Sequence, residues 1–209
     1  MMKKIALSFV LLLVVATLSA QETIAFGQET ESKKNNDQIQ TVMNSFKINR
    51  ISGFGGPTLS YTSMADEFAV MSGGGGGLII NNFFIGAYGE ELSNYLKTNP
   101  ANEIRNIEFS HGGFWLGYEF NHKQMIHPVL SLRTGWGRAK GIDTNNRLQT
   151  DDVFVAVPTL SAEINFTRFF KLNVGAEYRQ TFNLNNLGSY TNSDFSNMGV
   201  YMSFLFGWF

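Results

Sequence analysis

The sequence predicts an all-β chain, an eight-stranded antiparallel up-and-down transmembrane β-barrel. Eight segments of alternating hydrophobicity follow residue 48, the connections between them alternate between short and long, and their apolar faces end in aromatic side chains. Alternation indicates a strand because successive side chains point to opposite faces. An even number of such strands, with short turns at one end and long loops at the other, is typical of barrels that cross a membrane.

The last stretch, residues 197–209, shows the alternation most clearly. Its odd positions are small or mixed, whereas its even positions are all apolar: Met198, Val200, Met202, Phe204, Phe206 and Trp208. A long apolar edge strand invites aggregation in a soluble protein. Closure of a barrel in a bilayer removes this problem, because the edge pairs with the first strand and the apolar face meets lipid.

Eight strands are expected, each with about the 9 to 11 residues that a tilted transmembrane strand needs, some a little longer or shorter. They are residues 51–63, 67–80, 83–90, 108–120, 126–138, 153–166, 169–182 and 197–209. The connections 81–82, 121–124 and 167–168 are short, while 91–105, 139–151 and 183–196 are long and polar. Only 64–66 is short where a long loop is expected. Both chain ends then lie at the short-turn end, which in such barrels is the periplasm.

The fifth to seventh strands have the cleanest faces. In the fifth, for example, Leu130 and Leu132 share one face, and Ser131 and Arg133 the other. The apolar faces are assigned to lipid, where a Lys or Arg at the midplane costs roughly 2 to 4 kcal/mol. A soluble sandwich would reverse this assignment, and alternation alone does not distinguish the two. Aromatic residues near the strand ends favour membrane interfaces: Trp136, Phe166, Phe170, Tyr178, Phe206 and Trp208.

The run Gly73–Gly77 has no face of its own, so it reads either as a flexible linker or as part of the second strand. We favour the strand, because apolar residues flank the run on both sides. Glycine there lets a bulky side chain approach the backbone from inside the barrel. Trp115 or Tyr88 is expected to fill that space.

The N-terminus carries the pattern of a signal peptide, residues 1–20. Lys3 and Lys4 precede an apolar run at 5–18, and Ala20 offers a small residue at the cleavage site. The run is shorter than the roughly 18 to 20 residues of a membrane-anchor helix. Residues 21–47 are polar and form an expected periplasmic lead-in, and 48–209 form the outer-membrane barrel. The predicted location is the outer membrane, with both termini periplasmic.

Composition excludes several classes of protein. The formal net charge is −1, only 16% of the residues are charged and no basic patch is present, so nucleic acid is not an expected partner. The absence of Cys rules out disulfides, thiolate catalysis and Cys-based metal sites. The spacing of His111, His122 and His127 does not force a metal site, so neither a metal nor a cofactor is expected. Ser110 and His111 are adjacent and point to opposite faces, so they cannot form a catalytic dyad along one strand.

Charged residues fall on the predicted inner faces: Glu119, Arg133, Glu163, Lys171, Glu177 and Arg179. They indicate either a proton, ion or substrate site or a salt-bridge network that fills the interior. An eight-stranded barrel is just wide enough for side chains to fill, and buried charges must pair, so the structural network is favoured. Arg133, Glu163, Glu177 and Arg179 are expected to form one interlocked cluster that leaves no continuous water channel.

These features resemble the small eight-stranded bacterial outer-membrane β-barrels of the OmpX and OmpA-transmembrane-domain type, over about residues 48–209. That family typically ends on an aromatic residue, often Phe, in the same alternation as the apolar face. Here the apolar positions follow the register of Trp208, and Phe209 is left on the other face. The resemblance implies a role in envelope structure, adhesion or partner binding, and recognition of the C-terminal strand by the barrel-assembly machinery.

Three functions follow as hypotheses. The first is a non-enzymatic barrel that acts through its surface loops or as a subunit of an envelope complex, with outer-membrane lipid and an envelope protein as partners. The second is a small outer-membrane pore, which a plugged lumen disfavours. The third is a lipid-modifying outer-membrane enzyme, which the lack of a convergent Ser/His or acid pair disfavours. The first is the preferred reading.

Overall fold

The computed structural model describes residues 48–96, 104–143 and 145–209, which belong to one compact unit, Phe46–Phe209. The predicted signal peptide and the lead-in lie outside these residues. The described part holds one short helix, η1 (Asn192–Phe195), and these strands: β1 (Ile51–Met64), β2 (Glu67–Ile80), β3 (Phe83–Leu92), β4 (Ile104–Glu119), β5 (Ile126–Asp143), β6 (Leu148–Asn165), β7 (Phe170–Tyr178), β8 (Gln180–Phe182) and β9 (Met198–Trp208). No helix in these ranges is long and apolar enough to cross a membrane.

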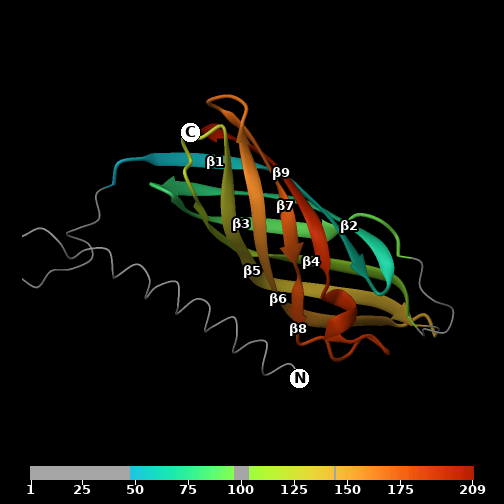
Figure 1. The fold of residues 1–209 in the computed structure, drawn as a ribbon. Coiled ribbons are helices and arrows are strands. Elements are labelled where there is room, and N and C mark those ends of the chain that lie inside the picture. The colour runs from blue at the N-terminus through green and yellow to red at the C-terminus, as the bar shows by residue number, and fades with distance from the viewer. Residues whose placement is uncertain (1–47, 97–103, 144) are drawn as a thin grey trace, which may run out of the picture. The chain divides into compact units, whose positions relative to one another are not determined.

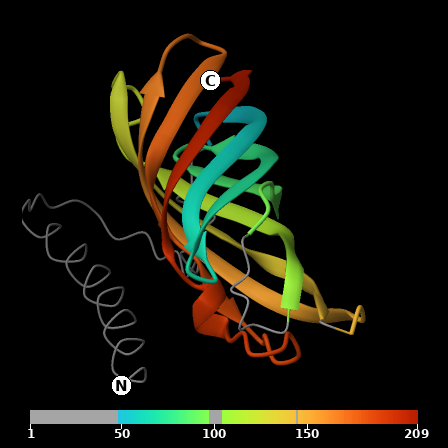
Figure 2. The same ribbon diagram turned by 90° about the vertical axis from the view of Figure 1, so that its right-hand side faces the viewer.

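The strands close into an antiparallel barrel (Figures 1 and 2). Each strand from β1 to β6 pairs with the next, β7 pairs with β9, and β9 returns to β1. β7 and β8 both pair with β6 and together replace one continuous strand. The barrel wall therefore has eight strand positions, one of which is shared by β7 and β8. The predicted up-and-down barrel is confirmed.

Two long strands correct the predicted boundaries. β5 continues to Asp143 and β6 begins at Leu148, so most of the expected loop 139–151 is a two-stranded hairpin. Its polar outward residues made it look like a loop, but Arg138 stands opposite Asp152 and Lys140 opposite Thr150 across the ladder. β3 and β4 likewise extend farther toward the long-loop end than 83–90 and 108–120 allow.

The seventh predicted strand, 169–182, is broken at Arg179. β9 begins only at Met198, so the chain beyond Tyr178 has no β9 partner. The segment around η1 fills the gap, because the Arg179 amide donates to the Asn197 carbonyl (2.9 Å) and the Thr181 hydroxyl donates to the Phe195 carbonyl (3.0 Å). The break thus marks the place where a loop takes over from a strand in the barrel wall.

The glycine run is part of β2, as predicted. Gly75 pairs with Gly56 on one side and Tyr88 on the other. A Cβ atom at Gly75 would lie 2.9 Å from Cε3 of Trp115. Trp115 is buried and packs edge-on against Phe54 and Phe84, with centroid distances of 5.3 and 5.7 Å. Glycine therefore lets the indole fill the barrel interior, as expected for Trp115.

The outer surface of the barrel carries an apolar belt. Leu130, Leu160 and Trp208 are 51%, 62% and 66% exposed, while the residues on either side of Leu130 and Leu160 are buried. Aromatic rings gather near both ends of the belt. Phe166, Phe170 and Phe206 adjoin at the short-turn end, and Trp136, Phe154 and Phe182 at the long-loop end. The predicted faces of β5, β6, β7 and β9 are confirmed by this exposure pattern.

The interior changes character along the barrel. Toward the long-loop end it is apolar. Val153, Val155 and Val157 of β6 point inward there and pack with buried residues of the last long loop: Leu184, Leu187, Tyr190 and Phe195. These side chains cap the barrel from within. Toward the short-turn end the interior holds charged groups, which form the candidate site.

Candidate functional site: the ion networks of the barrel interior

The six charged residues predicted for the lumen are all buried, none more than 2% exposed. They are Glu119, Arg133, Glu163, Lys171, Glu177 and Arg179. The expected single cluster is wrong, however, because their ion pairs form two separate groups. We call these the central network and the turn-end network.

The central network is built around Arg133. Its guanidinium forms ion pairs with both Glu90 and Glu177 and stacks over the ring of Tyr201, 4.4 Å from the centroid. Arg179 lies 3.5 Å from the second oxygen of Glu177. Two guanidinium groups and two carboxylates balance in charge. Buried ion pairs of this kind require close pairing, because an unpaired charge in a low-dielectric interior is costly.

Hydroxyl groups complete the central network. The hydroxyl of Thr58 donates to Glu90 (3.0 Å), and that of Ser60 donates to Glu177 (3.1 Å). Both come from β1, across the lumen from Arg133 on β5. The carboxylates thus receive charged and neutral donors from opposite walls, which holds the walls together through the lumen.

The turn-end network contains Lys171, whose ammonium donates to Glu119 (3.0 Å) and Glu163 (2.6 Å). The Arg50 guanidinium donates to the other oxygen of Glu119 (2.9 Å). His127 lies next to Glu163, with 3.1 Å between Nε2 and Oε1. Phe209 covers the network, its ring centroid 4.3 Å from the Lys171 ammonium. The terminal residue left over by the apolar register therefore faces the lumen.

An aromatic layer separates the two networks. Along β4 the inward residues run from Glu119 in the turn-end network through Trp115 to His111 beside the central network. Along β5 the same order is His127, Val129 and Arg133. Arg133 pairs with Val157 in the β5–β6 ladder, whereas Glu163 pairs with His127. Arg133 and Glu163 therefore lie at different depths in the barrel, which explains why the predicted cluster divides.

Several members of the networks were not singled out from the sequence. Glu90 shares the inward alternation of β3 with Phe84 and Tyr88, and this pattern was the available signal. Arg50 precedes the first strand and lies two residues before the inward Ser52, so the same alternation places it on the inner face. His111 and His127 are buried, as lumen histidines are expected to be, whereas His122 lies in the turn after β4. Partial burial and the nearby Arg50 charge lower the pKa of His122.

A cavity of about 1190 Å³ adjoins the central network. Its lining includes the inward side chains of Thr58, Glu90 and His111, together with Gly73 and Gly137. His111 Nδ1 lies 3.1 Å from the Tyr88 hydroxyl, and its Nε2 is 3.8 Å from Glu90. The neighbouring Ser110 is exposed on the outer face, which confirms that these two residues form no dyad.

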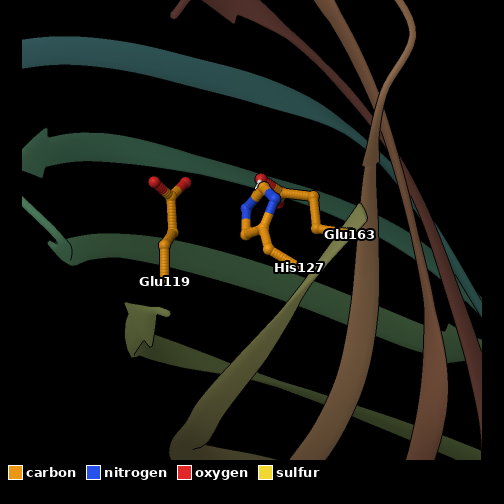
Figure 3. A group of neighbouring side chains, drawn as sticks. All are labelled: Glu119, His127 and Glu163. Carbon is orange, nitrogen blue, oxygen red and sulfur yellow. Dashed lines mark ion pairs between the residues drawn. The ribbon is translucent and has the colours of Figure 1, made fainter. Parts of the chain in front are cut away.

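The turn-end network also contains a compact group of metal-ligand types. Glu119, His127 and Glu163 each offer one ligand atom, and these atoms lie within 4.8 Å of one another (Figure 3). The side chains come from three consecutive strands, β4, β5 and β6, and all three are buried. Lys171 already places a positive charge between the two carboxylates.

No protein-family model and no curated protein matches this sequence. Among solved structures, the barrel is similar to Neisserial surface protein A, with a TM-score of 0.53 and 13% identity over 76% of this chain and 97% of that chain. The chain has the fold of the small eight-stranded outer-membrane β-barrels. Two further similar structures are Ail, the attachment invasion locus protein of Yersinia pestis (14% identity, TM-score 0.49, 76% and 97% covered), and the N-terminal β-barrel domain of Pseudomonas aeruginosa OprF (11%, 0.47, 75% and 97%).

Proposed function

We propose that this chain is a non-enzymatic outer-membrane protein that acts through the surface at its long-loop end, alone or as a subunit of an envelope complex. The observation that carries the proposal is the distribution of polarity. Apolar side chains face outward as a continuous belt, while charged residues such as Arg133 and Lys171 are buried inside. This is the reverse of a soluble barrel and the arrangement that a bilayer requires.

The long-loop end offers a structured surface for a partner. The β5–β6 hairpin carries exposed ion pairs between Arg138 and Asp152 (3.1 Å) and between Lys140 and Glu108 (3.3 Å). The last long loop is attached to this hairpin, because Asp151 accepts a hydrogen bond from the Asn186 amide (2.8 Å). A surface held in place in this way pays less conformational entropy on binding than a set of flexible loops.

The other two functions have less support. The two ion networks and the apolar cap cross the lumen at successive levels, which argues against an open pore. A lipid-modifying enzyme would need a nucleophile or an acid–base pair facing lipid. In the described ranges His111 faces inward and contacts Tyr88, away from Ser110 on the outer face. The chemistry of the site therefore favours structure and recognition.

Two further interactions belong to this proposal. The apolar belt would contact outer-membrane lipid, with the predicted girdle aromatics at the interfaces and both termini in the periplasm. The C-terminal strand, whose outward face runs from Met198 to Trp208, would be the segment that the barrel-assembly machinery recognises. Phe209 faces inward over Lys171, so Trp208 is the last aromatic on the outward face.

Mild solubilisation of outer membranes tests the proposal. The wild-type chain is compared with a variant in which residues 141–149 are replaced by Asn-Gly, a favoured two-residue hairpin turn. We expect both proteins to fractionate with the outer membrane, and a partner to co-purify only with the wild type. Recovery of the wild type in the soluble periplasm would contradict the membrane assignment. An identical set of co-purifying proteins for both would contradict a role for the tip of the hairpin, residues 141–149.

A further inference from the structure

The two ring nitrogens of His127 face two acceptors, a backbone carbonyl and a carboxylate. Nδ1 lies 3.2 Å from the backbone carbonyl oxygen of Gln124. A carbonyl only accepts hydrogen bonds, so Nδ1 donates to it, and Nε2 is the nitrogen that faces the cluster. Nε2 is buried and has no hydrogen-bond partner in the described structure. It points at the carboxylate of Glu163, 3.1 Å away.

With a proton on Nδ1 alone, Nε2 and the carboxylate of Glu163 would both be acceptors, so either a proton on Nε2 or a cation must lie between them. Lys171 does not resolve this contact, since the hydrogen bonds described for its ammonium end on Glu119 and Glu163. A cation between the imidazole and the carboxylates would satisfy all three groups. Figure 3 shows the three side chains converging on one region inside the barrel.

We propose that Glu119, His127 and Glu163 bind a divalent transition-metal ion of the Zn²⁺ class. One imidazole nitrogen with carboxylate oxygens is a donor set that suits Zn²⁺. Ca²⁺ and Mg²⁺ are disfavoured, because they prefer six or more oxygen ligands. The hydrogen bond from Nδ1 to a backbone carbonyl is also the arrangement that fixes metal-binding histidines.

Three consecutive strands position the ligands. His127 and Glu163 face each other in the β5–β6 ladder, and Glu119 pairs with Val129 in the β4–β5 ladder. Ligands on rigid strands hold their geometry better than ligands on loops. A bound ion would join β4, β5 and β6 near the short-turn end and stabilise the folded barrel by mass action.

The metal ion must compete with Lys171, which places its ammonium between the same carboxylates (3.0 and 2.6 Å). Displacement of this ammonium leaves two carboxylates facing the two charges of the ion, and Arg50 beside Glu119 remains as one additional positive charge. The site therefore differs from a simple metal centre, because an internal cation controls its occupancy. Removal of the ammonium should strengthen metal binding.

Calorimetric titration with Zn²⁺, using the purified full chain folded in detergent and freed of metal with a chelator, tests the proposal. We expect one ion per chain. His127→Ala should weaken binding at least 10-fold, while His122→Ala should leave it unchanged because that histidine lies in the partly buried turn after β4, outside the cluster. Lys171→Met should strengthen binding at least 10-fold. Co²⁺ provides a second readout, since its visible spectrum reports nitrogen and oxygen ligation.

Each variant is first checked for the gel mobility of the folded barrel, and Glu163→Gln serves as a milder ligand variant should His127→Ala fail to fold. Absence of Zn²⁺ binding by the wild type would overturn the proposal, even if Lys171→Met binds, because the ammonium would then exclude metal. Equal binding by the wild type and His127→Ala, or by the wild type and Glu163→Gln, would also overturn it.

Discussion

Arg133→Met should destabilise the barrel by about 3 kcal/mol. Methionine preserves much of the side-chain volume but leaves Glu90 and Glu177 without their shared guanidinium. Removing one partner of a buried ion pair typically costs about 3 to 5 kcal/mol. The lower end is expected here, because the hydroxyls of Thr58 and Ser60 still donate to the two carboxylates.

Arg138→Met is the matched control on the same strand. Its ion pair with Asp152 spans 3.1 Å, but the two side chains are 56% and 82% exposed. Exposed pairs contribute at most about 1 kcal/mol. Urea unfolding of both variants in lipid vesicles, followed by tryptophan fluorescence and gel mobility, gives the two free energies of unfolding.

A second substitution separates lost pairing from lost packing. Adding Glu90→Gln to Arg133→Met removes the carboxylate that is left without a guanidinium, while Glu177 keeps Arg179, and should recover part of the lost stability. The reasoning is refuted if Arg133→Met and Arg138→Met differ by less than about 1 kcal/mol, the scale of a surface pair. It is equally refuted if the second substitution destabilises the barrel further.

Three further outcomes are expected. Glu163→Leu should lower the free energy of unfolding by about 3 kcal/mol in the same urea assay, because Lys171 loses its shorter ion pair. Gly75→Ala should cost about 1 to 3 kcal/mol by overpacking against Trp115, whereas Gly89→Ala, where an added Cβ meets nothing within 4 Å, should have little effect. The wild type should show no steady conductance in planar bilayers; large, regular channels would instead favour a pore.

The fold was predictable because it depends on a period of two. Alternation alone predicts the face on which each residue of β5 lies, from the outward Leu130 to the inward Arg133. The inward charges were predictable for the same reason. Which inward charges form ion pairs was not predictable, because that depends on the register between strands that are far apart in sequence. Arg133 meets Glu90 across 43 residues, and Glu163 lies at another depth although it is also inward.

The long-loop end was less predictable than the belt. Leu184 and Leu187 are spaced three apart among polar residues, and this pattern gives no strand signal. They are buried because the loop folds back onto the inward valines of β6. The extension of β5 and β6 was missed for a related reason. Outside the belt, the two faces of the hairpin no longer differ in hydrophobicity, and the strand prediction rests on that difference.

The absence of Cys allows a direct test of which face meets lipid, since a single introduced cysteine carries a single spin label. Labels at Val129, Leu130, Ser131 and Leu132 are compared in vesicles for collision with oxygen, which concentrates in lipid, and with a water-soluble nickel complex. The proposed membrane barrel predicts high oxygen and low nickel accessibility at positions 130 and 132, and low oxygen accessibility at 129 and 131. High nickel accessibility at 130 and 132 would place the apolar belt in water and contradict the proposal.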